Sequence, residues 1–243
     1  MFRKASPRVY ELIDLIKDRS APSACFQDFD NSLRLEPLKK QVWLAREAEL
    51  DKLGEDAWDC LKKEARPYLA SPDPKRGWEQ LMSILNQARA YLYLQSIGCS
   101  TVRFIPRSKK QTPDLEGDLN GRTVLCEVKT INISDTEANA RCSGAGRPIT
   151  GSLKDGFFHK LRSDLEGAEA QTQSYTDGRN ARRIVFVVVN FDDMLGEYKT
   201  EYYKQIDASL EQAPIRGKEI VFYNRRTAFH TPIAMNSATV LNE

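Results

Sequence analysis

The chain has 243 residues, with 36 lysines and arginines against 34 aspartates and glutamates, and hydrophobic residues make up 41% of it. This length suits one large domain, or a compact domain with an extension, and the apolar content argues against wholesale disorder. The net charge of +2 is too small to indicate nucleic-acid binding by itself.

The composition gives no sign of a membrane, a secreted or a zinc-binding protein. The longest apolar run, residues 184–189, is far shorter than the roughly 20 residues that a membrane-spanning helix needs. Residues 1–20 carry charges throughout and lack the apolar segment of a signal peptide. The five cysteines are odd in number, widely spaced and without a C-x-x-C pair. We therefore expect a soluble, cytoplasmic protein.

Two segments near the N-terminus, residues 8–19 and 37–70, have apolar residues at helical spacing. Two prolines in the stretch 71–74 then end any helix, because proline lacks an N–H donor and disfavours helical geometry in the preceding residue. We therefore expect a helical N-terminal segment over residues 1–75, followed by a second domain over residues 76–243.

The second part begins with the clearest helix of the chain. Residues 78–97 have apolar side chains every three or four positions, and Gly98 stands where a left-handed cap is expected. Residues 101–105 are β-branched or aromatic and predict a short strand. A local group of basic side chains follows, which suits a phosphate backbone or a solvated loop equally well: Arg103, Arg107, Lys109 and Lys110.

Further elements are predicted towards the C-terminus. Residues 134–152 show no periodicity and are rich in small and polar side chains, so we expect a long loop on the substrate side. The later pattern predicts a helix, a buried strand, a helix and a short strand, over residues 157–175, 183–190, 198–210 and 219–223.

A β-hairpin carries the candidate chemistry. Asn120-Gly121 separates two strand-like runs, residues 114–119 and 122–131, and favours a two-residue turn. With that turn, Asp114 lies directly opposite Glu127, and Lys129 points to the same face. Opposed like charges are destabilising, so a divalent cation between the two carboxylates is expected.

Asp114 and Glu127 offer the hard oxygen ligands that Mg²⁺ or Mn²⁺ prefers. Such a cation lowers the pKa of a bound water and polarises a phosphodiester oxygen. Lys129 is suited to orient that water and to stabilise the growing negative charge. Glu116 and Asp118 are on the same face, where either an auxiliary ligand or a merely solvated carboxylate is expected.

The pattern Pro113-Asp114, twelve intervening residues and Glu127-Val128-Lys129 resembles the signature of the PD-(D/E)XK nuclease superfamily. Its members share a restriction-endonuclease-like core in the order helix, three strands, helix, strand, which the predicted elements of residues 78–190 follow. The resemblance implies an α/β fold with a mixed central sheet flanked by helices. It also implies a Mg²⁺-dependent hydrolase that cleaves phosphodiester bonds in nucleic acid, with DNA as the expected substrate.

Two further positions follow from the resemblance. Many members carry an acidic residue on the first helix about three turns before a glycine, and this chain has Gln87 there. Gln87 is favoured as a contact to a metal-bound water, and Glu79 is the alternative two turns earlier. Gln171 and Tyr175 resemble the Gln-x-x-x-Tyr element of exonuclease branches, although a plain helix surface explains them equally well.

Other functions stay open. A nucleic-acid-binding module of the same fold without cleavage is one alternative, because Gln87 replaces an acidic residue. An RNA-directed nuclease is another, although no aromatic strand pattern of the common RNA modules is present. The sequence does not distinguish endonuclease from exonuclease action, and it leaves a homodimer open.

Overall fold

The computed structural model describes residues 2–16, 26, 28–70, 77–106, 111–144, 148–176, 180–193, 196–214, 218–224 and 227–230. The chain divides into two compact units, Met1–Ile97 and Gly98–Glu243. Among the described residues, no helix has the length and apolar content that crossing a membrane requires.

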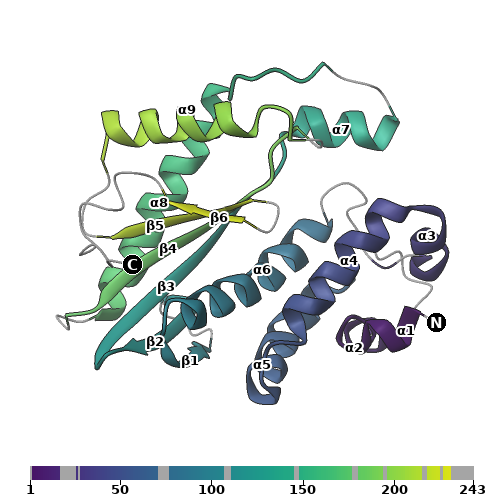
Figure 1. The fold of residues 1–243 in the computed structure, drawn as a ribbon, viewed down its shortest axis with the longest axis horizontal. Helices are drawn as coiled ribbons and strands as arrows, with labels where there is room; N and C mark the ends of the chain where they lie inside the picture. Colours follow the sequence, from purple (N-terminus) through teal and green to yellow (C-terminus); the bar gives the residue numbers. More distant parts are fainter. Residues whose placement is uncertain are drawn as a thin grey trace. The chain divides into compact units, whose positions relative to one another are not determined.

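The first unit is helical (Figure 1). Its elements are α1 (Phe2–Ala5), α2 (Pro7–Asp14), α3 (Phe29–Leu35), α4 (Pro37–Leu50), α5 (Glu55–Ala65), the short 3₁₀ helix η1 (Arg66–Tyr68) and α6 (Gly77–Ser96). The segment predicted as one helix over residues 37–70 is therefore interrupted between Leu50 and Glu55. Gly54 takes an extended conformation at the start of α5, which ends the continuity of the two helices.

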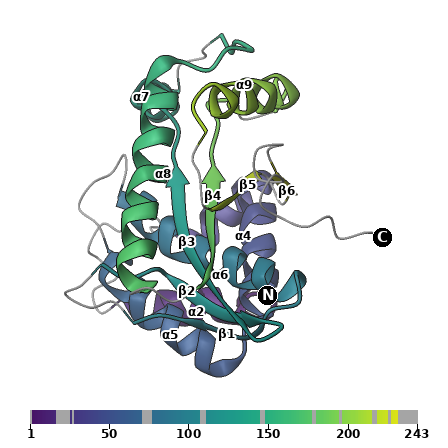
Figure 2. The same cartoon turned by 90° about the vertical axis from the view of Figure 1, so that its left-hand side faces the viewer.

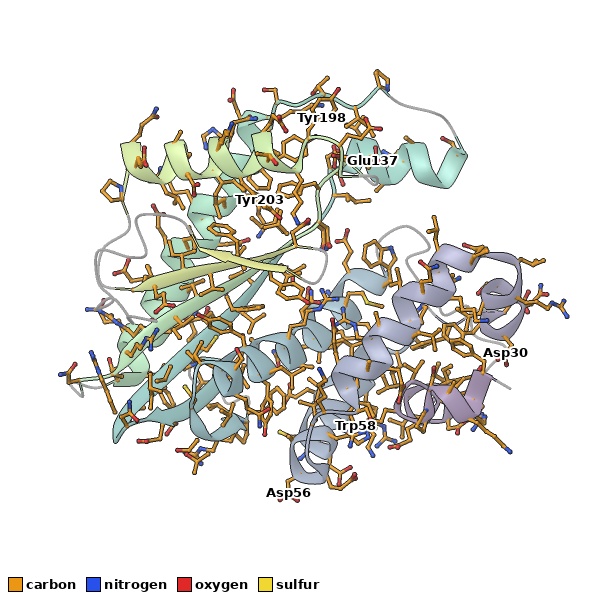
Figure 3. The ribbon with its side chains drawn as sticks, viewed as in Figure 1. Asp30, Asp56, Trp58, Glu137, Tyr198 and Tyr203 are labelled. Atoms are coloured by element: carbon orange, nitrogen blue, oxygen red, sulfur yellow. The ribbon has the colours of Figure 1, made fainter. Side chains whose placement is uncertain are left out.

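An aromatic cluster and a buried carboxylate hold the first unit together. Phe26 and Phe29 each pack against Trp43, with ring centroids 5.3 Å apart. Glu47 is buried, and its two oxygens accept hydrogen bonds from the backbone N–H groups of Arg8 and Val9. Because these donors lie in the first turn of α2, Glu47 satisfies groups that a helix start otherwise leaves unpaired. Figure 3 shows Trp58 on α5, where it is 1% exposed.

Helix α6 belongs to the first unit, whereas the sequence analysis grouped it with residues 76–243. Arg46 on α4 donates to the carbonyl oxygen of Leu85 at 3.1 Å and to Asn86 Oδ1 at 3.0 Å. Arg89 on α6 also pairs with Glu49 on α4 at 3.0 Å. These polar contacts tie α6 to α4 and agree with a boundary after Ile97. The proline-containing stretch 71–74 lies outside the described residues.

The second unit is an α/β unit with a mixed sheet (Figures 1 and 2). Its elements are β1 (Ser100–Phe104), β2 (Leu115–Leu119), β3 (Arg122–Ile131), α7 (Asp135–Ser143), α8 (Asp155–Thr176), β4 (Arg182–Val189), α9 (Lys199–Gln212), β5 (Glu219–Asn224) and β6 (Thr227–His230). The strands lie in sequence order, β1 to β6. The pairs β3–β4 and β4–β5 are parallel, and the other three pairs are antiparallel.

The predicted hairpin and its register are confirmed. Leu119 pairs with Arg122 and Leu115 with Cys126, which are the pairings of a two-residue turn. Asn120 and Gly121 have φ values of 56° and 80°. Positive φ at both positions is the geometry that a type I′ turn needs, and asparagine and glycine adopt it at low cost.

The long loop predicted over residues 134–152 is wrong in its first half, which forms α7. Ser134 Oγ accepts a hydrogen bond from the backbone N–H of Glu137 at 3.1 Å. This is the serine half of a capping box, and the pattern Ser-x-x-Glu was the available signal for a helix start. The residues that follow have only a weak amphipathic pattern, so their spacing did not predict the helix.

One face of the sheet is covered by α8 and α9. The strand β3 contributes Ile131 to this core, and its side chain lies on the face that Glu127 and Lys129 also occupy. The other buried members include Leu161 and Leu165 of α8. Figure 2 shows α8 running alongside β3. The face that carries the candidate site is therefore the inner face beneath α8.

We predict that Gly121→Ala destabilises the protein by about 1 kcal/mol, because alanine is strained at positive φ. Gly167→Ala is the matched control, since a Cβ at Gly167 meets no atom within 4 Å and the residue lies inside α8. This control should raise the free energy of unfolding by about 0.5 to 1 kcal/mol. Urea denaturation of both variants measures the effects, and a neutral Gly121→Ala would contradict the turn assignment.

Candidate active site

The hairpin brings Asp114 to Glu127. Asp114 directly precedes β2, and its backbone carbonyl accepts a hydrogen bond from the N–H of Ile105 at 2.9 Å. Its carboxylate reaches across to β3, where Oδ2 accepts from the backbone N–H of Val128 at 2.8 Å. The N–H of Val128 therefore fixes the Asp114 carboxylate beside Glu127, whereas the N–H of Ile105 fixes the Asp114 backbone near the end of β1.

Glu127 is a buried carboxylate with one satisfied and one unsatisfied oxygen. Its residue is 3% exposed. Oε1 accepts a hydrogen bond from Lys129 Nζ at 2.8 Å, whereas Oε2 is buried without a hydrogen-bond partner. Burial, and then the negative charge of Asp114, raise the pKa of Glu127 from 4.5 to about 8, although Lys129 opposes this shift.

Two acceptors, one on β3 and one on α8, hold the Lys129 side chain. Its ammonium donates to Glu127 Oε1 at 2.8 Å and to Gln171 Oε1 on α8 at 2.9 Å. The ion pair with Glu127 has the same 2.8 Å distance and is mostly shielded from water. Gln171 therefore fixes the direction of the ammonium, which a long flexible side chain would not keep by itself.

The donor set fits a hard divalent cation. Among the described residues, no group of three or more histidine, cysteine, aspartate and glutamate side chains could hold a metal ion. Mg²⁺ needs less than that, because it commonly binds through one or two carboxylates and keeps several waters. The buried, unpartnered Oε2 of Glu127 beside Asp114 is the oxygen that such an ion would satisfy.

Glu116 lies on the same face but has other partners. Its Oε1 is 3.3 Å from a guanidinium nitrogen of Arg103, and its Oε2 accepts from Tyr175 OH at 3.4 Å. Both oxygens are thus engaged, which reduces the availability of Glu116 as an auxiliary ligand. Asp118 Oδ1 accepts from the backbone N–H of Gly121 at 2.8 Å and supports the turn instead.

Four of the predicted site residues come together: Asp114, Glu127, Lys129 and Gln171. Gln87 and Glu79 belong to the first unit, where Gln87 is buried on α6, and their roles stay predictions. Three of the basic residues that were considered for phosphate contacts lie outside the described residues: Arg107, Lys109 and Lys110.

Sequence reasoning missed the pairing of Arg103 with Glu116. These residues are opposite each other in the β1–β2 pair, but the register of that pair shifts between Ser100 and Arg103. A ten-residue connection separates β1 from β2 in the sequence, so no turn motif set their register in advance. The pairing leaves Arg103 bound to an acidic partner rather than free for phosphate.

Comparison of the chain with protein-family models, with curated proteins and with solved structures finds no match among them. The geometry of the chain itself therefore carries the functional argument.

We predict that the free energy of unfolding in EDTA falls as pH rises from about 5 to about 8. In that window the folded chain keeps a proton on Glu127, whose pKa is about 8, whereas an unfolded glutamate near 4.5 releases it. The folded state thus binds more protons, and its stability is lost with increasing pH.

Urea denaturation across this pH range tests the prediction. Glu127→Gln should flatten the slope, because glutamine does not titrate. Glu201→Gln changes an exposed glutamate at the start of α9 and should keep the wild-type slope. Parallel curves for wild type and Glu127→Gln would show that Glu127 is not the group that titrates.

Proposed function

We propose that this protein is a metal-dependent nuclease of the PD-(D/E)XK superfamily that hydrolyses phosphodiester bonds, with DNA as its substrate. One observation carries the proposal. Asp114 and the buried Glu127 lie side by side with an unpartnered carboxylate oxygen, and Lys129 is hydrogen-bonded to the same glutamate. The proposal thus has two carboxylate ligands for Mg²⁺ next to a lysine ammonium that would stabilise the developing negative charge.

Each residue has a distinct role in the proposal. Asp114 and Glu127 hold the cation, and the N–H of Val128 keeps the Asp114 carboxylate oriented. When bound, Mg²⁺ or Mn²⁺ lowers the pKa of a water ligand and polarises the scissile phosphate. Lys129 orients the attacking water and stabilises the negative charge that develops on the phosphate. Gln171 is a positioning residue that directs the Lys129 ammonium.

The order of elements supports a restriction-endonuclease-like core. Helix α6 precedes the antiparallel strands β1, β2 and β3, and α8 leads to β4, which lies parallel to β3. The helix α7 is an addition between β3 and α8 in this order. Asp114 directly precedes the second of these strands, and Glu127 and Lys129 lie on the third.

The alternatives of a pure binding module and of an RNA substrate predict different measurements. A binding module keeps nucleic-acid affinity without a need for Mg²⁺, and an RNA-directed enzyme cleaves RNA in preference to DNA. The orphaned oxygen of Glu127 favours an enzyme, because a binding module gains nothing from a buried unpaired carboxylate and bears its desolvation cost.

Incubation of the purified chain with linear DNA, circular DNA and RNA tests the proposal, with Mg²⁺, Mn²⁺ or EDTA in parallel. We expect metal-dependent cleavage of DNA and its loss in EDTA. Asp114→Asn should lower the rate by at least about 100-fold, as removal of a group that stabilises transition-state charge typically does. Cleavage of circles would identify an endonuclease.

Lys129→Ala should abolish cleavage while leaving the fold and DNA affinity nearly intact, because the Lys129 ammonium is bonded to the site residues Glu127 and Gln171, and the hydrophobic core of that face is built from other side chains. Asp118→Asn is the matched control on the same hairpin, since asparagine keeps the acceptor for Gly121 N–H. Wild-type cleavage by Asp114→Asn, or equal loss in Asp118→Asn, would contradict the assignment of the site.

A further inference from the structure

A separate cavity lies in the second unit, beyond the carboxyl end of β3. Its volume is about 480 Å³, within the size range of small-molecule sites. It is lined by the last residue of β3, by the connections around α7 and by the first turns of α8. Figure 2 shows α7 and α9 beyond the arrowheads of β3 and β4. The carboxyl ends of parallel strands are a common location of ligand sites.

The wall formed by residues 148–154 is fastened to α9. Tyr202 OH donates to the carbonyl oxygen of Thr150 at 2.7 Å, and Gln205 Nε2 donates to that of Gly151 at 2.6 Å. The backbone N–H of Leu153 donates back to Gln205 Oε1 at 2.9 Å. These hydrogen bonds hold the wall in place without a ligand, so ligand binding would not have to order this segment.

Another part of the lining is also held by hydrogen bonds. Asp192 accepts from the backbone N–H of Ser134 at 2.8 Å and from its hydroxyl at 2.6 Å. Ser134 in turn caps α7, on which Glu137 lies in the first turn (Figure 3). The ring of Phe157 packs 6.0 Å from that of Phe191 and contributes an aromatic face to the lining.

The cavity continues the row of side chains that forms the candidate active site. Glu127, Lys129 and Ile131 alternate along β3 and therefore lie on one face of the strand. Glu127 and Ile131 are four residues apart, or about 13 Å along a strand. Ile131 lines the cavity, so the two features are neighbours on the same inner face.

The lining combines apolar, basic and acceptor groups. The apolar part includes Ile131, Leu153 and Phe157, which suits a planar ring. Two lysines line the cavity, Lys154 and Lys160, and both are exposed residues. Lys160 pairs with Asp164, whereas Lys154 has no ion pair within the described part of the chain. A ligand that combines an anionic group with an aromatic ring matches this set of lining groups.

We propose that this cavity binds one nucleoside monophosphate unit, with its base against the apolar lining and its phosphate at Lys154 and Lys160. The inference rests on the proposed nuclease function and assigns that site a neighbouring nucleotide pocket. The unit is either a free mononucleotide or the terminal nucleotide of a strand, which share this chemistry.

Calorimetric titration of the full chain in EDTA, with each of the four deoxynucleoside monophosphates, tests the proposal. At least one should bind saturably at a 1:1 ratio, and the corresponding nucleoside should bind about tenfold more weakly, because it lacks the phosphate. Lys154→Glu should weaken binding by a similar factor of about ten. Lys204→Glu, an exposed charge reversal on α9, should leave it within about twofold.

Oligonucleotides with and without ends distinguish the two sources. If the ligand is a strand terminus, a linear oligonucleotide competes better than its circular form and better than the mononucleotide. If the ligand is a free nucleotide, the mononucleotide competes best. Absence of saturable binding by every probe, or binding that Lys154→Glu and Lys160→Glu leave unchanged, would overturn the pocket assignment.

Because the titration is done in EDTA, it tests the pocket independently of the metal-dependent nuclease activity. Saturable binding that depends on Lys154, in a protein that cleaves no nucleic acid, supports the pocket and contradicts the nuclease proposal. Cleavage without any nucleotide binding supports the nuclease and overturns the pocket.

Discussion

The register of the β2–β3 hairpin is the constraint on which the candidate site depends. The turn at Asn120 and Gly121 pairs Leu115 with Cys126, and this places Asp114 next to Glu127. A shift by one residue would turn every side chain of one strand to the opposite face and separate the two carboxylates. Two turn residues with positive φ therefore decide whether the acidic pair exists.

The acidic pair has an energetic consequence for the free protein. Glu127 is buried with an unsatisfied oxygen, and Asp114 adds a like charge, so the ionised form is disfavoured. Lys129 offsets part of this cost, because its ammonium donates a hydrogen bond to one oxygen of Glu127. A buried acidic pair that destabilises the free protein, and that a bound cation would stabilise, is expected where residues are selected for function and not for stability.

Local sequence signals predicted the hairpin well, whereas features that depend on contacts between distant residues were not predicted. Asn120-Gly121 determines its own turn, so the β2–β3 register could be derived from adjacent residues. The contact between Lys129 and Gln171 joins residues 42 positions apart, and only a resemblance singled out Gln171. The membership of α6 in the first unit depends on Arg46, whose partners lie 39 and 40 positions away. No local pattern contains such information.

Binding of Mn²⁺ to the purified chain, followed by electron paramagnetic resonance, tests the central claim most directly because it requires no substrate. The account predicts a saturable Mn²⁺ site in the wild-type protein that Mg²⁺ displaces. That site should be lost or much weakened in Asp114→Asn and in Glu127→Gln, each of which removes one carboxylate ligand. A wild-type Mn²⁺ site that persists unchanged in both variants would contradict the account.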